Sequence, residues 1–161
     1  MQTRIDFLKV SPAAMKTMLD MEAYLAKSSI ERPLLHLIKM RVSQINGCAY
    51  CLDMHSKDAR NEGETEQRLY ALDAWREAPF YSARERAALA WAEALTLVAQ
   101  SHAPDAEFEA ARAEFSESEL VDLSLAVVAI NGWNRLSIGF RAQAGNYRPP
   151  ATARLSTAAA H

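Results

Sequence analysis

The sequence contains few helix-breaking residues and little cysteine, with 5 glycines, 6 prolines and 2 cysteines in 161 residues. Long uninterrupted helices are therefore possible, and no run of alternating β-branched residues bounded by turns predicts a strand. The length fits one domain better than two. Because 50% of the residues are hydrophobic, one sizeable core can form. We expect a single all-α domain over residues 1–161.

An excess of charge of one sign is also lacking, since the formal net charge is −2. The basic face typical of nucleic-acid binding is absent, and aromatic residues are too sparse for a base-stacking platform. The longest charge-free apolar run, residues 123–130, is far shorter than the roughly 20 residues of a membrane-spanning helix. The first ten residues have no apolar segment typical of a secretory signal. We therefore expect a cytoplasmic protein without a nucleic-acid or membrane partner.

Helical periodicity and capping signals divide the chain into helices. Ser82 and Glu85 have capping-box spacing before one apolar stripe, and Ser116 and Glu119 before a second, which is expected to end near Asn131–Gly132. The other expected helices cover about residues 11–28, 34–45, 48–60, 65–77 and 105–113, with a broken helix after residue 133. The segment from about residue 145 to 161, rich in proline and alanine, is expected to form a loose tail.

Three reactive side chains lie close together in the sequence at Cys48, Cys51 and His55. In a reducing compartment, a cysteine pair is more often catalytic or metal-binding than structural. On a helix, Cys51 and His55 are neighbours at positions i and i+4, which places a potential base beside a thiol. The imidazole can take the thiol proton or stabilise the thiolate. The sequence thus predicts a thiol-redox site.

The residues alone do not decide which cysteine is the stronger thiolate. If Asn46 is the N-cap, Cys48 lies in the first helical turn, where backbone N–H groups favour an anion. Proximity to His55 favours Cys51 instead. A disulfide between helical i and i+3 residues, whose Cβ atoms are about 5–6 Å apart, would be strained and easily reduced.

Two other interpretations of the cysteines remain open. Both cysteines could be small core residues, with His55 as an ordinary surface histidine. The pair and His55 could instead supply three zinc ligands, with His36 or Asp58 as the fourth. Structural zinc sites usually draw on two separated ligand pairs, and the sequence has no second pair. Haem attachment is excluded because Leu52, rather than histidine, follows the second cysteine.

The stretch Arg41–His55 resembles the core of the alkylhydroperoxidase AhpD-like proteins of the carboxymuconolactone decarboxylase superfamily. The resemblance continues through Gln67–Leu69, Ala74–Glu77 and Arg84–Thr96. It implies a compact all-α bundle that assembles into a symmetric homo-oligomer, a trimer or hexamer. It also implies a thiol-dependent peroxidase that reduces hydrogen peroxide or organic hydroperoxides without a metal or other cofactor.

The resemblance also assigns roles at the site. Cys51 attacks the peroxide, Cys48 resolves the resulting sulfenic acid as a disulfide, and His55 assists proton movement. A dithiol or a lipoyl-bearing protein is the expected reductant. The alternatives are a non-catalytic thiol redox sensor and a lactone decarboxylase of the same superfamily, whose reaction needs no thiols.

Two positions depart from the family pattern. His36 replaces a glutamate that usually lies twelve residues before the first cysteine and acts as a base. A histidine also moves protons near neutral pH, but it does not hold a neighbouring imidazolium as a carboxylate does. We therefore count His36 as a candidate catalytic residue, beside the alternative that it only lies at the edge of a helix face. Tyr50 replaces the histidine found between the cysteines of the best-known enzymes.

Overall fold

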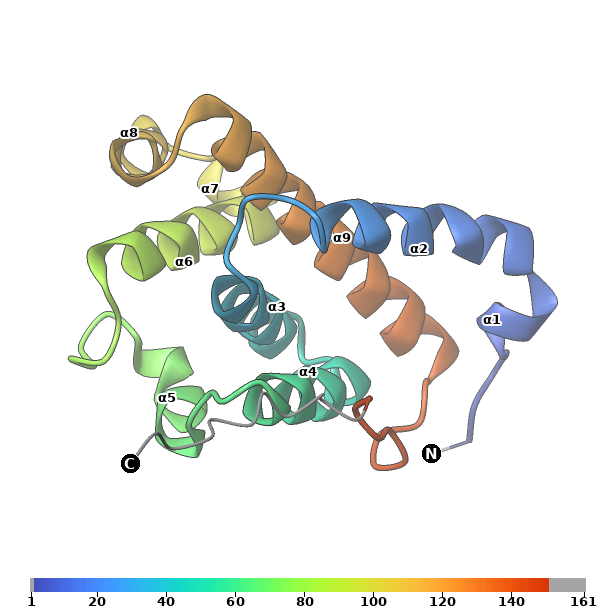
Figure 1. Cartoon of the computed structure of the whole chain (residues 1–161). Helices are drawn as coiled ribbons and strands as arrows, with labels where there is room; N and C mark the ends of the chain where they lie inside the picture. Colours follow the sequence, from blue (N-terminus) through green and yellow to red (C-terminus); the bar gives the residue numbers. More distant parts are fainter. Residues whose placement is uncertain (1, 151–161) are drawn as a thin grey trace, which may run out of the picture.

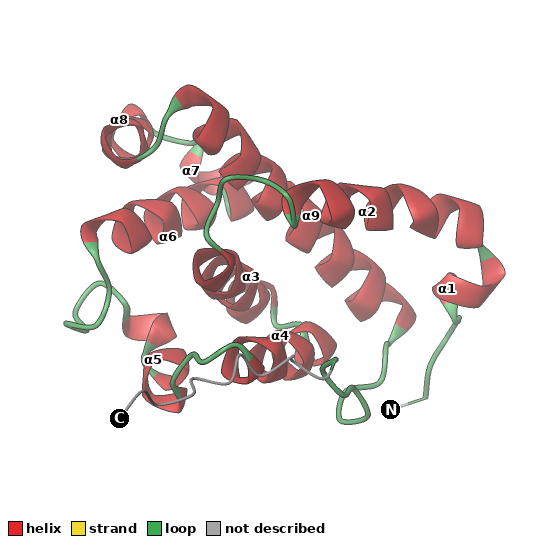
Figure 2. Ribbon diagram, viewed as in Figure 1, coloured by secondary structure: helices red, strands yellow, loops and turns green. Residues whose placement is uncertain are grey.

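A computed structural model describes residues 2–150, and every regular element within them is a helix (Figure 2). This confirms the expected all-α fold class. The elements are α1 (Phe7–Val10), α2 (Pro12–Leu25), α3 (Arg32–Asn46), α4 (Ala49–Asn61), α5 (Glu66–Tyr70), the 3-10 helix η1 (Leu72–Ala74), α6 (Ala83–Thr96), α7 (Val98–Ser101), α8 (Asp105–Glu114) and α9 (Glu117–Phe140). Within the described residues, no helix is long and apolar enough to cross a membrane.

Helix α3 lies in the middle of the molecule and packs against α4, α6 and α9 (Figure 1). Its side chains are buried on several sides, among them Leu35, Leu37, Ile38 and Val42. Full burial of such a side chain stabilises the fold by about 1.5–3 kcal/mol. Because α3 is held on three sides, it provides a fixed support for α4, which carries Cys51 and His55.

The buried side chains form two clusters. The larger one joins α3, α6, α8 and α9 and includes both cysteines. The smaller one lies under α5 and η1 and is built around Leu37, Leu72, Trp75 and Leu89. Because Leu37 of the smaller cluster and Ile38 of the larger one are adjacent in α3, this helix joins the two clusters.

Both predicted capping boxes are confirmed. The Ser82 hydroxyl accepts from the Glu85 N–H, and the Glu85 carboxylate accepts from the Ser82 N–H, at the start of α6. Ser116 and Glu119 make the same reciprocal bonds at the start of α9. Each box satisfies two backbone donors that the first helical turn leaves free.

The expected end of the last long helix near Asn131–Gly132 is wrong, because α9 continues to Phe140. The Asn131 side chain donates to Thr96 Oγ1 and to the Val127 carbonyl, so it bonds within and across helices rather than ending one. A Cβ atom at Gly132 would lie 2.9 Å from Met18 Cε. This glycine therefore allows α2 to approach α9 closely instead of breaking the helix.

The single helix expected over residues 65–77 is also wrong, because the chain forms α5 and then η1. Arg86 of α6 donates to the carbonyl oxygens of Trp75, Arg76 and Ala78. These bonds replace helical ones, since a buried carbonyl needs some donor. Tertiary contacts thus override the local helical pattern. At the other end of the chain, α2 stops at Leu25, a few residues before the expected end.

The segment that follows α9 runs beside α4. The Gly145 N–H donates to the Asp53 carboxylate, and Lys57 Nζ donates to the Gly145 and Tyr147 carbonyls. The Tyr147 hydroxyl donates to Asp58 at 2.7 Å. Residues 145–150 are thus attached to α4, whereas the rest of the predicted loose tail lies outside the described residues.

Candidate active site around Cys48 and Cys51

The turn between α3 and α4 determines where the cysteines lie. The expected N-cap role of Asn46 is wrong, because Asn46 is the last residue of α3 and Cys48 is the N-cap of α4. Gly47 lies between them at φ 69°, a left-handed conformation that other residues rarely adopt. The Cys51 N–H donates to Cys48 Sγ at 3.4 Å. Cys48 is thus outside the helix, so the predicted strain of a helical i, i+3 disulfide does not apply.

Both thiols are 1% exposed, yet their environments favour different protonation states. The pKa of Cys48 falls to about 7 because its sulfur accepts hydrogen bonds from the Cys51 thiol and N–H, and from Ser137 and Asn134, against the opposing effect of burial. The pKa of Cys51 rises because its proton is held by Cys48, because it is buried and because Cys48 carries the charge. The first proton therefore leaves Cys48, and the remaining proton is shared between the two sulfurs.

His55 lies one helical turn after Cys51 in α4 and is only 6% exposed. Burial, with smaller Coulombic contributions from Lys39 and His36, lowers the pKa of His55 to about 3. The imidazole is therefore neutral near pH 7. A neutral imidazole accepts or passes a proton, but it does not stabilise a thiolate by charge. A lowered pKa is thus compatible with proton transfer by His55 and not with charge stabilisation of a thiolate, and both roles remain predictions.

The structure places His36 on α3, beside the end of α4. Its Nε2 atom lies 3.1 Å from Glu62 Oε2, and Arg32 donates to the same carboxylate from Nε at 3.0 Å. The other imidazole nitrogen, His36 Nδ1, is buried and has no hydrogen-bond partner within residues 2–150. An unpaired buried polar atom lowers the stability of the fold by about 1–3 kcal/mol, so such atoms are rare in native structures.

A polar stripe of α9 lies behind the cysteines. Asn134 is fully buried, accepts from the Asn46 side chain at 2.8 Å and donates to Ser43 Oγ at 3.1 Å. Asn134 and Ser137 also contribute to the lowered pKa of Cys48. The sequence analysis missed both residues. Their helical spacing within an apolar helix was the available signal, and it was hidden by the expectation that the helix ends at Asn131–Gly132.

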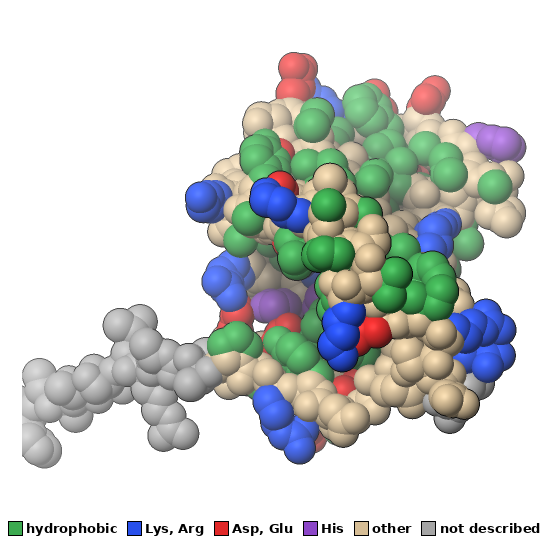
Figure 3. Space-filling model, turned by 90° about the vertical axis from the view of Figure 1, so that its right-hand side faces the viewer, with side chains coloured by type: hydrophobic (Ala, Val, Ile, Leu, Met, Phe, Trp, Pro, Cys, Tyr) green, Lys and Arg blue, Asp and Glu red, His purple; other side chains and the backbone are tan. Residues whose placement is uncertain are grey.

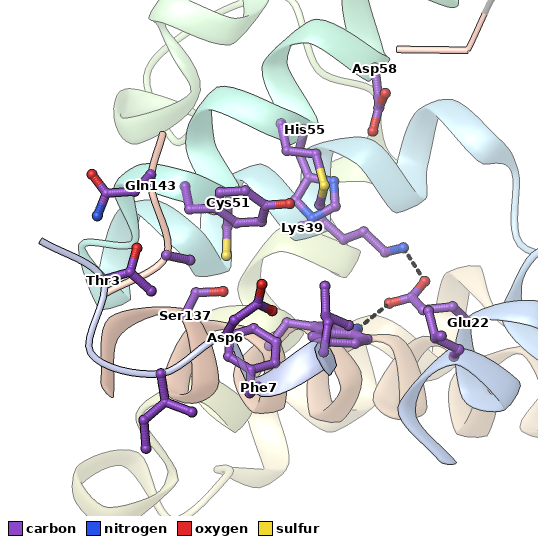
Figure 4. A pocket seen from close by; sticks show the side chains of 17 residues that line it. Thr3, Asp6, Phe7, Glu22, Lys39, Cys51, His55, Asp58, Ser137 and Gln143 are labelled. Atoms are coloured by element: carbon purple, nitrogen blue, oxygen red, sulfur yellow. Dashed lines mark hydrogen bonds and ion pairs between the residues drawn. The ribbon is translucent and has the colours of Figure 1, made fainter. Parts of the chain in front are cut away.

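A cavity of about 510 Å³ opens beside Cys51 and His55. Figure 4 shows Cys51 and His55 on one side of this space and Asp6 and Phe7 on the other. The face of the molecule in Figure 3 shows apolar side chains gathered around a hollow. The lining residues are Thr3, Ile5, Asp6, Phe7, Leu8, Leu19, Glu22, Lys39, Tyr50, Cys51, Met54, His55, Asp58, Trp133, Ser137, Ala142 and Gln143. Cys51 is therefore the cysteine that borders the cavity, and Cys48 lies behind it.

Charged groups in the cavity wall are largely paired. Glu22 of α2 accepts from Lys39 Nζ at 2.6 Å and from Trp133 Nε1 at 3.1 Å (Figure 4). Asp58 accepts from the Tyr147 hydroxyl. His55, by contrast, makes no hydrogen bond within the described residues. The polar side chain that follows Cys51 by one helical turn is therefore not committed to a partner within these residues.

The described residues contain no group of three or more His, Cys, Asp or Glu side chains placed to hold a metal ion. The predicted zinc alternative needs His36 or Asp58 next to the cysteines and His55. His36 instead pairs with Glu62, and Asp58 pairs with Tyr147. The geometry thus gives the zinc interpretation no support.

Known proteins resemble this chain over most of its length. The model of the carboxymuconolactone decarboxylase family matches residues 12–94. The uncharacterised protein YdfG of Bacillus subtilis is 49% identical over 138 residues, which span 86% of this chain and 94% of that protein. A protein of unknown function from Agrobacterium tumefaciens, suggested to be the antioxidant defence protein AhpD, has a TM-score of 0.87 at 46% identity, covering 89% of this chain and 99% of that one.

A more distant structure shows the same fold. The AhpD core of an uncharacterised peroxidase-related protein from Ralstonia eutropha JMP134 has a TM-score of 0.75 at 19% identity, covering 86% of this chain and 74% of that one. The helical arrangement and the adjacent cysteines therefore define an AhpD-like protein. The chain belongs to the carboxymuconolactone decarboxylase family, as the matched region and the close relatives show. This superfamily includes decarboxylases and peroxidase-related proteins.

Proposed function

We propose that this protein is a thiol-dependent peroxidase in which Cys51 reacts with the peroxide and Cys48 resolves the product. The observation that carries this proposal is the arrangement of the two thiols. Cys51 borders the cavity, while Cys48 lies behind it and ionises first. A substrate in the cavity thus meets Cys51, and a thiolate waits directly behind the sulfur that becomes oxidised.

The proposed reaction proceeds in two steps. The Cys51 proton moves to a neighbouring base, and the Cys51 thiolate attacks one peroxide oxygen while the O–O bond breaks. The other oxygen takes up a proton and leaves as an alcohol or water, which leaves Cys51 as a sulfenic acid. The Cys48 thiolate then attacks the Cys51 sulfur and the S–O bond breaks. The leaving hydroxide takes up a proton from solvent and departs as water, and the Cys48–Cys51 disulfide is formed. A dithiol or lipoyl-bearing protein reduces this bond again.

The base at the start of the reaction is His55 or the Cys48 thiolate. His55 is neutral near pH 7 and has no competing hydrogen bond within the described residues. Cys48 already shares a proton with Cys51. His36 remains a candidate proton carrier that lies away from the cavity wall.

The size and lining of the cavity favour organic hydroperoxides over hydrogen peroxide. A volume of about 510 Å³ lies in the range of small-molecule binding sites. Phe7, Leu19 and Met54 line it with apolar surface. We expect the apolar tail of an organic hydroperoxide to fill this space, with its O–O group at Cys51.

We also propose that the protein forms a symmetric homo-oligomer, a trimer or hexamer. The support is a pair of exposed apolar side chains seven residues apart on α9, where Val121 is 67% and Val128 57% exposed. Residues at this spacing share one helix face, and exposed apolar side chains on one face are typical of protein interfaces. Size-exclusion chromatography with light scattering tests this proposal, and a monomeric mass at micromolar concentration contradicts it.

The peroxidase proposal is tested by mapping alkylation of the peptide that carries both cysteines before and after one equivalent of cumene hydroperoxide. Wild-type protein should lose two alkylation sites and regain them with a dithiol. Cys51→Ser should form no sulfenic acid, whereas Cys48→Ser should accumulate it or form mixed disulfides. Full peroxide turnover by Cys51→Ser contradicts the assignment. Single oxidation without turnover in the presence of dithiol indicates a redox sensor.

A further inference from the structure

One face of α4 borders the cavity for about two helical turns beyond the reactive thiol. Cys51, Met54, His55 and Asp58 all line the space, and they follow one another at positions i, i+3, i+4 and i+7 of this helix. A helix rises about 1.5 Å per residue, so the backbone of Asp58 lies roughly 10 Å along the axis from that of Cys51. A small molecule that extends along this face from Cys51 can therefore reach Asp58 with its other end.

Asp58 is the carboxylate of the cavity wall that has no ion pair within the described residues. The other two, Glu22 and Asp6, are paired with lysines at 2.6 Å and 2.9 Å. Asp58 Oδ1 accepts from the Tyr147 hydroxyl, and Asp58 Oδ2 makes no hydrogen bond in the part of the chain that the structure describes. Burial and the bond to Asp58 raise the pKa of Tyr147 to about 12, so the hydroxyl is neutral near pH 7. The tyrosine therefore leaves the charge of Asp58 uncompensated.

The cations close to Asp58 are already held by other carboxylates. Arg32 is near enough to interact with Asp58 through space, but its Nε atom donates to Glu62 at 3.0 Å. Lys39, which also lines the cavity, donates to Glu22 at 2.6 Å. The two cations are thus matched by two carboxylates, and the negative charge of Asp58 remains at this end of the cavity.

The charged end of the cavity lies apart from the thiol. Figure 4 shows Asp58, Lys39 and Glu22 on the side of the space that is away from the Cys51 sulfur. Much of the remaining wall is apolar and includes Phe7, Leu19, Met54 and Trp133. The cavity therefore offers a reactive sulfur at one end, apolar surface along its wall and a half-buried carboxylate at the other end.

We propose that the cavity selects its substrate by charge, with Asp58 binding the far end of an organic hydroperoxide that carries an ammonium or a neutral hydrogen-bond donor there. The O–O group of this substrate lies at Cys51. A carboxylate at the far end is rejected, because like charges repel strongly where water screens them poorly. Substrates with a cationic end thus rank first, those with a neutral end second and those with an anionic end last. This selection rests on the proposed peroxidase function of Cys51.

The test compares three cumene hydroperoxides that carry an aminomethyl, a hydroxymethyl or a carboxyl group para to the carbon that bears the hydroperoxide. The full chain is assayed at pH 7 with dithiothreitol, and each kcat/KM is divided by the rate constant of that hydroperoxide with dithiothreitol alone. The normalised kcat/KM should fall in the order given, by roughly tenfold or more from first to last at low salt. Added salt should reduce the difference. Equal values, or a preference for the carboxyl compound, overturn the proposal.

Asp58→Asn tests the residue itself, because it removes the charge and keeps an oxygen that can accept from Tyr147. The preference for the aminomethyl over the carboxyl compound should fall by about fivefold or more in this variant. Asp20→Asn is the matched control, since Asp20 is an ion-paired aspartate on α2, a helix that borders the cavity, but does not itself line it. It should keep the wild-type preference within about twofold. An unchanged preference in Asp58→Asn, or an equal loss in both variants, overturns the role of Asp58.

Binding of the product alcohols distinguishes charge selection from peroxidase function. The three tertiary alcohols that correspond to the hydroperoxides have no O–O bond, so their affinities are measured by calorimetry without turnover. Wild type should bind them in the same order, and Asp58→Asn should lose that order. If the alcohols follow the order but no hydroperoxide is reduced, the proposed function fails and charge selection by Asp58 stands. If the three hydroperoxides are reduced equally well, the proposed function stands and charge selection fails.

Discussion

Glu93 lies in a partly buried polar site and His55 in a buried one, but Glu93 has several hydrogen-bond partners whereas the His55 side chain has none within the described residues. Glu93 on α6 accepts from Arg41 Nε at 2.7 Å, Trp75 Nε1 at 2.8 Å and Arg76 Nη1 at 2.5 Å. Despite its burial, hydrogen bonds from Trp75, Arg76 and Arg41 keep the pKa of Glu93 below its usual value. At the cavity, the His55 side chain makes no hydrogen bond within the described residues. Away from the cavity wall, His36 Nδ1 is buried without a partner among the same residues.

This difference indicates which part of the molecule is built for stability and which for chemistry. A buried polar group with all its partners is fixed in one state, since any proton or bond it gave up would leave another group unpaired. A buried polar group without partners destabilises the fold and is free to bind or move a proton. Perturbed, unpaired groups beside a cavity are typical of functional sites.

The largest expected difference between the His55 site and the Glu93 site is in the rate of peroxide reduction. His55→Gln should lower the rate of peroxide reduction by about 100-fold, the lower range for loss of a general base. The free energy of unfolding at pH 7 should change little, because the imidazole makes no hydrogen bond within the described residues. Stopped-flow oxidation and urea denaturation measure the two quantities. An unchanged rate would remove His55 from the proposed mechanism.

A substitution at Glu93 should instead lower the free energy of unfolding. Glu93→Gln leaves Arg41, Trp75 and Arg76 with a neutral partner in a partly buried site, which should lower the free energy of unfolding by about 2 kcal/mol. The rate of peroxide reduction should stay within about twofold, since Glu93 does not line the cavity. Urea denaturation at pH 7 measures the stability, with Glu66→Gln as the control. A large loss of rate without loss of stability would contradict the comparison.

The smallest expected effect is a loss of stability in mild acid that depends on His55. The unfolded chain binds a proton at this histidine below about pH 6.5, whereas in the folded protein its pKa is about 3. Stability from the neutral imidazole is therefore complete above pH 6.5 and is lost as the pH falls toward 3. Between pH 7 and 5.5, wild type should lose about 1 kcal/mol more than His55→Gln. Equal pH dependence of the two proteins would show that His55 is not buried as described.

Sequence motifs correctly predicted the structural features that depend only on residues a few positions apart in the chain. The capping boxes at Ser82 and Ser116 were correct because their bonds form within one helical turn. Asn131 and Gly132 misled the prediction because their roles are tertiary. Asn131 bonds to Thr96 of another helix, and Gly132 makes room for Met18. No window of the sequence around residue 132 contains this information.

The candidate site was likewise predictable only where its residues lie close together in the sequence. Cys51 and His55 lie on one helix, so their spacing alone placed them on one face. The cavity that they border needs α1, α2 and α9, and the Glu62–His36 contact needs α3 to pack on α4. Asn46 illustrates the limit, since it resembles an N-cap in sequence but bonds to Asn131 and Asn134. The roles predicted for Cys48, Cys51, His55 and His36 stay predictions until the proposed variants are measured.

The walls of the cavity come from both ends of the described chain, because Thr3 to Leu8 meet Ala142 and Gln143 there. During synthesis on the ribosome, the early residues and the cysteine helix emerge long before α9 and the segment after it. The nascent chain therefore exposes Cys48 and Cys51 to the surrounding thiols and oxidants before the cavity exists.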